Sequence, residues 1–192
     1  MKTLSKIYDS HSQARRVVTE LEGAGIPASE ISIVANKSVT DHYVDDDETS
    51  GAATGAGVGA ALGGGAGLLA GLGIMAIPGI GPVVAAGWFA SMALGVAAGA
   101  ATGGIIGALT DAGVPKEHAE AYSEAIRRGG TLVTVRAQDK DIAKVEAILG
   151  RYESIDPMSR TDEYRESGWK GYDASAAPYD LTDQDRDRIG RM

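Results

Sequence analysis

Apolar and polar positions near the start of the chain follow two different periods, which together predict a compact β-α-β unit. Residues 3–8 alternate roughly between polar and apolar side chains, as is typical of a strand. Apolar residues then recur at helical spacing from Ala14 to Leu21, and Gly23 or Gly25 would end this helix. Residues 30–35 predict a second, more buried strand.

The same two periods return after residue 113. Pro115 is well placed to begin a helix that the pair Gly129 and Gly130 would stop. The elements predicted here are a helix at 115–128, a strand at 131–136, a helix at 139–150 and a short strand at 152–155. The order β-α-β-β-α-β is that of a ferredoxin-like sandwich, so we expect an α+β fold built from residues 1–36 and 113–157.

Between these halves lies a stretch, residues 50–110, without a single charged residue or histidine. Small residues recur there at every fourth position, which places them on one helix face along which another backbone can approach closely. The two runs are Gly51, Gly55, Gly59, Gly63, Gly67, Gly71 and Gly87, Ser91, Gly95, Gly99, Gly103, Gly107. Prolines and glycines at 76–82 would break any helix. The pattern therefore predicts a glycine-zipper helical hairpin at 50–112, in which these small residues pack the helices together.

Each arm of this hairpin has about 25 residues, or about 37 Å as a helix, against a bilayer core of about 30 Å. Its uncharged turn, together with Trp88 as an interfacial aromatic, favours a hairpin inserted in a membrane. Bulky apolar side chains are sparse in the first arm, which leaves a soluble hairpin buried in an oligomer as the alternative. The opening residues are not typical of a signal peptide, so the N-terminus is expected to stay in the cytoplasm.

Two further stretches lack sustained periodicity. Residues 37–49 form an acidic linker, and residues 158–192 are expected to be a disordered acidic tail. Within this tail Trp169, Tyr172 and Asp173 form an aromatic island that predicts a docking segment for an unknown protein partner. The alternative is that the island folds back onto its own domain.

Composition narrows the possible chemistry. The formal net charge of −8 gives no basic footprint for nucleic acid, and the absence of cysteine excludes disulfides and thiolate sites. The glycine-rich runs lack the Lys-Ser/Thr of a phosphate-binding loop. His42 lies beside four aspartates and suggests a weak cation site, although a solvated linker explains it more simply. We therefore expect no enzyme, no cofactor and no metal.

Three stretches resemble the bacterial general stress protein family, the 17M-like group also described as heat-induced or low-temperature-induced stress proteins. They are the opening unit ending in Ile31, Ser32, Ile33 and Val34, the glycine-zipper insertion, and the run from Val114 and Pro115 through Arg127, Arg128, Gly129 and Gly130 to Val135. The stretch 168–173 also resembles a tail motif of bacterial stress proteins. The resemblance implies induction under stress and membrane association, and it supplies no catalytic residues.

The sequence therefore predicts a non-enzymatic stress-response protein that forms a homo-oligomer through its zipper and contacts membrane lipid. Its location would be the bacterial inner membrane, with the soluble parts in the cytoplasm. The alternatives are a soluble self-assembling scaffold, an oligomeric pore and, from fold analogy alone, a small-ligand sensor.

Overall fold

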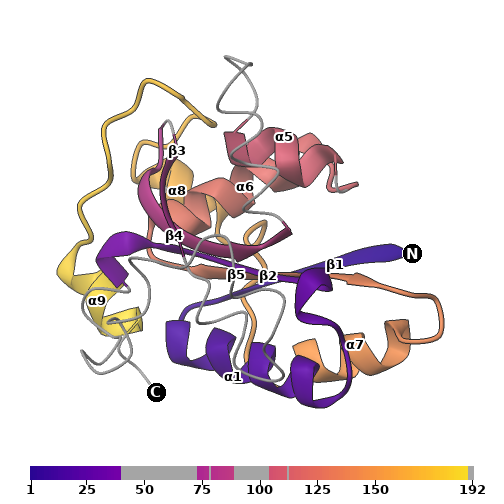
Figure 1. The fold of residues 1–192 in the computed structure, drawn as a ribbon. Helices are drawn as coiled ribbons and strands as arrows, with labels where there is room; N and C mark the ends of the chain where they lie inside the picture. The colour runs from indigo at the N-terminus through magenta and orange to yellow at the C-terminus, as the bar shows by residue number, and fades with distance from the viewer. Residues whose placement is uncertain (40–72, 78, 89–103, 112, 190–192) are drawn as a thin grey trace.

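A computed structural model describes residues 1–39, 73–77, 79–88, 104–111 and 113–189 (Figure 1). The strands are β1 (Lys2–Tyr8), β2 (Ile31–Asn36), β3 (Gly73–Ile77), β4 (Gly81–Gly87) and β5 (Thr131–Ala137). The helices are α1 (His11–Gly23), the 3-10 turn η1 (Ala28–Glu30), α5 (Gly104–Asp111), α6 (Lys116–Arg127), α7 (Ile142–Leu149), α8 (Thr161–Glu166) and α9 (Asp183–Ile189). The expected α+β class is confirmed.

The strands form one five-stranded sheet in the order β1-β5-β2-β4-β3, and every neighbouring pair is antiparallel. β5 lies between β1 and β2, with Leu132 opposite Ile7 on one side and Val34 on the other. The side chains of Thr131 to Val135 are all buried, because helices cover both faces of the sheet at this strand. The centre of the sheet is therefore made by strands from both halves of the chain.

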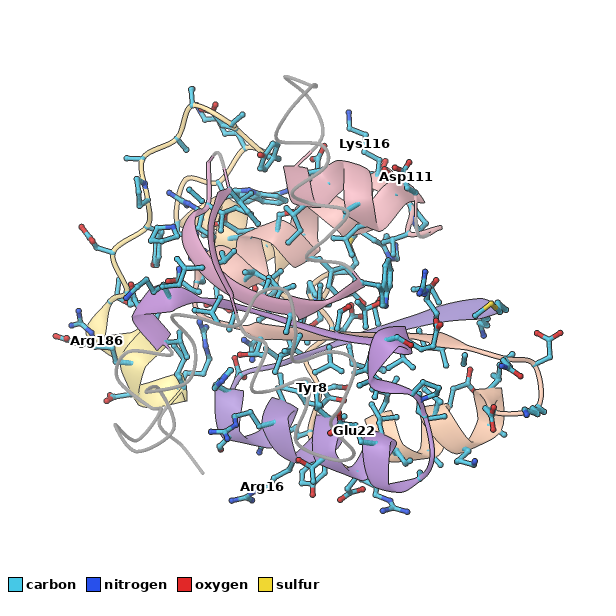
Figure 2. All side chains as sticks on the ribbon, viewed as in Figure 1. Tyr8, Arg16, Glu22, Asp111, Lys116 and Arg186 are labelled. Carbon is cyan, nitrogen blue, oxygen red and sulfur yellow. The ribbon has the colours of Figure 1, made fainter. Side chains whose placement is uncertain are left out.

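Two apolar cores lie on opposite faces of the sheet. Helices α1 and α7 cover one face, where Val17, Leu21 and Val145 are buried. Tyr8 lies between this face and the helices, and its hydroxyl donates to the carbonyl oxygen of Leu149 at 2.7 Å (Figure 2). Helices α5, α6 and α8 cover the other face (Figure 1), where the buried residues include Ile105, Leu109, Ile126 and Tyr164.

The structure departs from the predicted helical hairpin in its middle. Residues 73–87 form the antiparallel hairpin β3–β4, and β4 pairs with β2, with Val34 opposite Ala85. Valine and isoleucine favour strands, and Gly79 and Gly81 have φ values of +74° and +102° that suit a tight turn. The apolar turn was therefore predicted correctly, but the elements that flank it are strands of the domain.

The two ends of the second half also differ from expectation. The predicted fourth strand reduces to one antiparallel bridge, between Ile7 and Ile155. The tail predicted to be disordered instead carries α8 and α9, whose Tyr164 and Ile189 are buried. The tail has no hydrophobic periodicity because its few buried residues are separated by polar sequence. These residues pack on surfaces contributed by distant parts of the chain, so local sequence did not indicate that the tail is ordered. No helix in the described ranges is both long enough and apolar enough to span a membrane.

Candidate functional site at the C-terminal end of helix α6

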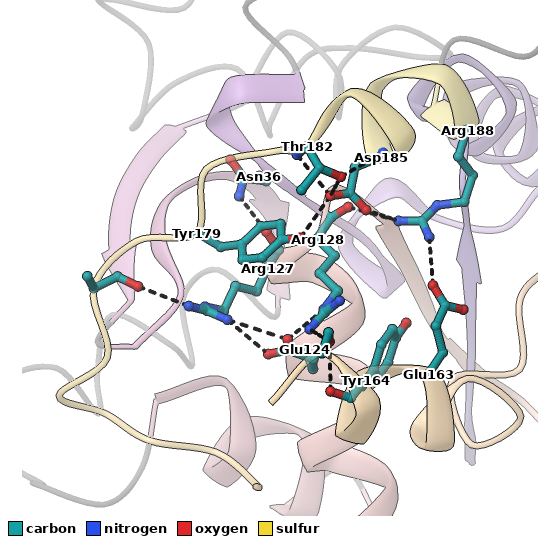
Figure 3. A network of polar contacts seen from close by, with 12 residues as sticks. Asn36, Glu124, Arg127, Arg128, Glu163, Tyr164, Tyr179, Thr182, Asp185 and Arg188 are labelled. Atoms are coloured by element: carbon teal, nitrogen blue, oxygen red, sulfur yellow. Dashed lines mark hydrogen bonds and ion pairs between the residues drawn. The ribbon is translucent and has the colours of Figure 1, made fainter. Parts of the chain in front are cut away.

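Helix α6 ends beside the tail in a cluster of charged and aromatic side chains (Figure 3). Its apolar side packs on the sheet through Ala119, Ala125 and Ile126, which fixes the rotation of the helix. Gly129, at φ +96°, ends the helix in a conformation that side-chain-bearing residues rarely adopt. The last turn therefore holds Glu124, Arg127 and Arg128 in fixed positions under the tail.

Glu124 and Arg128 form a buried ion pair. The Nε of Arg128 donates to Oε1 of Glu124 at 2.6 Å, and the two side chains are only 8% and 4% exposed, respectively. Nη1 of Arg127 approaches the same carboxylate at 3.4 Å. Because both members of the buried pair are removed from water, each charge depends on the other for its stabilisation.

Two tyrosine rings of the tail pack on these guanidinium groups. The guanidinium of Arg128 lies 4.7 Å from the ring centre of Tyr164 and 5.1 Å from that of Tyr179. The guanidinium of Arg127 lies 5.0 Å from the centre of the Tyr179 ring. These distances are typical of cation–π contacts. Burial raises the pKa of Tyr164 to about 12, against the opposing charges of Arg160, Arg188 and Arg128, so its phenol is neutral at pH 7.

Hydrogen bonds reinforce this contact between α6 and the tail. Nη2 of Arg128 donates to Oγ of Ser167 at 2.6 Å, and Nη2 of Arg127 donates to the carbonyl oxygen of Ala177 at 3.2 Å. Behind the helix, the side-chain amide of Asn36 donates to the carbonyl oxygen of Arg127 at 3.1 Å. The two guanidinium groups thus join the end of α6 to two points along the tail, while the backbone of Arg127 joins α6 to the end of β2.

Asp185 organises the last helix, α9. Its Oδ2 accepts hydrogen bonds from the hydroxyls of Thr182 at 2.6 Å and Tyr179 at 2.9 Å, and its Oδ1 pairs with Arg188 at 2.8 Å. Burial works to raise the pKa of Asp185, yet the bonds from Thr182 and Tyr179 and the Arg188 charge hold that pKa below its ordinary value. Asp185 is therefore ionised at neutral pH and fixes Tyr179 over the arginines.

Asp9, at the end of β1, ties both tail helices to the start of the chain. It accepts a two-pronged contact from Arg160, at 2.8 Å to each carboxylate oxygen. Nε of Arg188 lies 3.1 Å from the Oδ1 atom of Asp9. Paired guanidinium–carboxylate contacts of this kind add geometric specificity as well as attraction. The tail is consequently held at α6 and at β1.

A cavity of about 480 Å³ lies between α6, the β3–β4 turn and the tail. Its lining includes Glu120, Arg127, Lys170 and Asp173, with the rings of Trp169 and Tyr179. This volume is in the range of small-molecule sites, but acidic and basic side chains are balanced around it. The guanidinium groups of Arg127 and Arg128 already contact a carboxylate, two rings, a hydroxyl and a carbonyl group of this chain. Glu124, Arg127 and Arg128, with Tyr164 and Tyr179, therefore act as a clamp on the tail.

The aromatic island packs beside this clamp. Trp169 and Tyr172 are half-buried against the core beneath α6, and the Trp169 ring meets Tyr164 edge-on at 6.1 Å. Asp173 accepts two hydrogen bonds from Ser175, at 2.8 Å from its N–H and 2.6 Å from its hydroxyl, and these lower the pKa of Asp173. A Cβ on Gly79 would collide with the carbonyl oxygen of Asp173. The island thus folds back onto its own domain, as in the alternative considered for it.

Most of the predicted helix-packing residues lie outside the described residues: Gly51, Gly55, Gly59, Gly63, Gly67, Gly71, Ser91, Gly95, Gly99 and Gly103. Gly107 lies in α5, where an added Cβ would meet no described atom within 4 Å. Gly87 was wrongly placed in a helix, since it ends strand β4 at φ +87° and a Cβ there would collide with the carbonyl oxygen of Ile31. The absence of a side chain at this position allows β4 to pair closely with β2.

Trp88 packs on the domain, a position different from the membrane interface expected for it. Its Nε1 donates to the carbonyl oxygen of Glu30 at 3.2 Å, and the Arg136 guanidinium lies 4.8 Å from its ring centre. Arg136 also pairs with the Glu30 carboxylate at 2.8 Å. Trp88 thereby fixes the point at which the chain leaves β4.

The clamp residues were not identified from the sequence. The spacing of Glu124 from Arg127 and Arg128, three and four residues, is the one local signal that they share a helix face. Their partners Tyr179, Asp185 and Arg188 are distant in sequence, so no local pattern indicates them. Within the described part of the chain, no group of three or more acidic or histidine side chains is arranged to hold a metal ion.

Comparisons with protein-family models, with curated proteins and with solved structures found no match to this chain.

Proposed function

We propose that this chain is a non-enzymatic stress-response protein that self-associates through the glycine-rich segments carried by its α+β domain. One observation carries the proposal: both ends of each segment are held in the same folded unit. Segment 40–72 follows Val39, which is packed against Ile189 of α9, and precedes Gly73 of β3. Segment 89–103 follows Trp88 and precedes α5.

This arrangement bears on the choice between membrane insertion and assembly in water. A helical segment that leaves and rejoins one folded unit has to cross a bilayer twice, which takes about 40 residues at about 20 per crossing. Neither 40–72 nor 89–103 reaches that length. The geometry therefore favours a self-assembling scaffold over an inserted hairpin or pore, and lipid contact would be limited to one leaflet.

The β3–β4 hairpin also places the attachment points of the two segments side by side. Gly73 is paired with Ala85, two residues before the end of β4. Both segments consequently join the same end of the hairpin. Small residues spaced by four allow close backbone approach, so two such runs that start together are suited to pack on each other or on those of a second copy.

We also propose that the sheet is a ferredoxin-like sandwich with the β3–β4 hairpin added. The order β1-β5-β2 and the placement of α1 and α7 on one face support it. The bridge from Ile155 to Ile7 lies where a fourth strand would pair with β1. The stress-response part of the proposal rests on the resemblance of the residues described above to general stress proteins.

The assembly is tested by replacing Gly63 and Gly99 with leucine in one variant, with Ala61 and Ala97 replaced by leucine as the matched control. We expect Gly63→Leu/Gly99→Leu to reduce the particle mass in sedimentation, because leucine side chains separate the packed backbones, while circular dichroism stays unchanged. The alanine control places the same leucine side chains away from the zipper positions, adding three carbon atoms at each site instead of four, and should retain the native mass. Equal masses for all three proteins would contradict the proposal.

Fractionation tests the choice of environment. A scaffold is expected in the soluble fraction as a large particle, and any protein in the membrane pellet should be released by a carbonate wash. Retention in the washed pellet until detergent is added would instead support an inserted hairpin.

A further inference from the structure

The two edges of the sheet differ in how they are protected from other strands. The β1 edge carries Lys2 and Lys6 beside the charged N-terminus, and Ile155 bridges to it. Lysines and short covering segments are common means of blocking an edge. The β3 edge, Gly73–Ile77, contains no charged residue and no proline. Among the residues that the structure describes, features that prevent pairing with a second chain lie at the β1 edge and not at the β3 edge.

The β3 edge also exposes apolar surface. Ile74 is 67% exposed, and among the described large hydrophobic residues only Met1 is comparably exposed, at 73%. Ala76 is exposed on the same side of the strand, and its cross-strand neighbour Pro82 is exposed too. Ile77, by contrast, is buried in the core that α5 and α6 cover. An uncharged apolar strip therefore follows this edge, with which no described strand pairs.

We propose that β3 pairs antiparallel with β3 of a second copy, so that the sheet continues through both molecules. A strand edge is complementary to itself, because its alternating N–H and C=O groups match those of the same strand turned around a two-fold axis. Each copy carries a formal net charge of −8, so two copies repel over most of their surfaces. The uncharged β3 edge is where they approach without that repulsion.

This inference deepens the proposed self-association but uses different residues. The zipper contact would be made by Gly63 and Gly99, and the edge contact by β3 around Ile74. Variants that block one contact leave the other intact, so the zipper contact and the β3 edge contact can be disproved independently.

The test places a charge at position 74. The Ile74→Lys substitution puts two like charges near each other across the two-fold axis and should block pairing, whereas the exposed position tolerates the change in the folded monomer. Ile74→Thr keeps a β-branched side chain without charge and should pair as the native strand does. Thr3→Lys adds the same charge to the already protected β1 edge and should have no effect on association.

The measurements are made by sedimentation in the Gly63→Leu/Gly99→Leu background, where zipper contacts are blocked. We expect that background to be a dimer, and adding Ile74→Lys to give a monomer with unchanged circular dichroism. Mixing the Ile74→Lys and Ile74→Glu forms should restore a dimer, since opposite charges then face each other. A monomeric background whatever residue stands at 74, or a dimer that persists with Ile74→Lys, would overturn the inference. A background with the native mass would count against the zipper contact alone.

Discussion

Burial of the His11 side chain makes the free energy of unfolding depend on pH. It is 2% exposed, and its Nε2 has no hydrogen-bond partner among the described residues. Its Nδ1 lies 3.4 Å from the hydroxyl of Thr131, the first residue of β5. Burial, and next the charge of Arg15, lowers the pKa of His11 from 6.5 to about 4. The folded protein therefore keeps this imidazole neutral where an unfolded chain would protonate it.

Stability should consequently fall as the pH falls from about 6.5 to about 4, because over that window the unfolded chain binds a proton that the folded chain excludes. The contribution amounts to about 3 kcal/mol in the free energy of unfolding. Urea unfolding across this range, compared between the native protein and His11→Gln, measures it. His11→Gln should show the shallower dependence, and His118→Gln, at an exposed position of α6, should match the native protein. Parallel curves for native and His11→Gln would refute the assignment.

Because Glu124 and Arg128 are buried, loss of either charge should lower the free energy of unfolding more than loss of an exposed charge would. Removing one member leaves the other buried and unpaired, so Glu124→Leu should lower the free energy of unfolding by about 3–5 kcal/mol. The double variant Glu124→Leu/Arg128→Met should recover part of that loss, since two apolar side chains can replace a buried pair. Denaturant titration with circular dichroism gives both values.

The same helix supplies the control. Lys116 and Glu120 have the same spacing of four residues but are 3.8 Å apart, and their side chains are 76% and 27% exposed, against 8% and 4% for Arg128 and Glu124. Glu120→Gln should change stability by less than about 1 kcal/mol. If it cost as much as Glu124→Leu, burial would not be the reason for the difference.

At the scale of elements, the tail is ordered by its contacts with α6 and β1. Tyr179 is central, because its ring packs on both arginines and its hydroxyl bonds to Asp185. Tyr179→Ala should loosen the tail by roughly 1.5 kcal/mol, or about tenfold in the opening equilibrium. Trypsin cleavage after Lys170, followed by mass spectrometry, should accelerate by about that factor.

Tyr179→Phe separates the two contributions of this residue. It keeps the ring over Arg127 and Arg128 and loses only the bond to Asp185, so cleavage should remain within about threefold of the native rate. Tyr179→Ala cleaved at the native rate would mean that the ring contacts do not hold the tail.

Local patterns predicted the elements that form from their own residues and missed those that need a distant partner. Alternation over residues 3–8 and the glycine stops at Gly23 and Gly129 correspond to β1, α1 and α6. Gly87 follows the spacing of four as well as any residue of its run, yet it lies in β4. Its conformation is set by pairing with Ser32 of β2, a context that spacing along the chain does not carry.

The clamp was missed for a related reason at the scale of the whole molecule. Arg127 and Arg128 appear in the sequence as two charges at a helix end, a position that solvent or the helix dipole would explain. Their burial depends on Tyr164 and Tyr179, which lie in a segment without periodicity. What the sequence did indicate was the aromatic island around Trp169, since tryptophan and tyrosine in a polar tail are unusual enough to suggest contact with some surface.

The position of β5 between β1 and β2 has a consequence for synthesis on the ribosome. β1 and β2 are made early but have no hydrogen bonds to each other, and their shared partner Thr131–Ala137 emerges about 100 residues after β2. At 5–20 residues per second that interval lasts roughly 5–20 s. The uncharged glycine-rich stretch emerges during this wait, before the sheet that will hold its ends exists. During those seconds β1 and β2 of the nascent chain have no partner strand, and unpaired strand edges of this kind favour aggregation with neighbouring nascent copies.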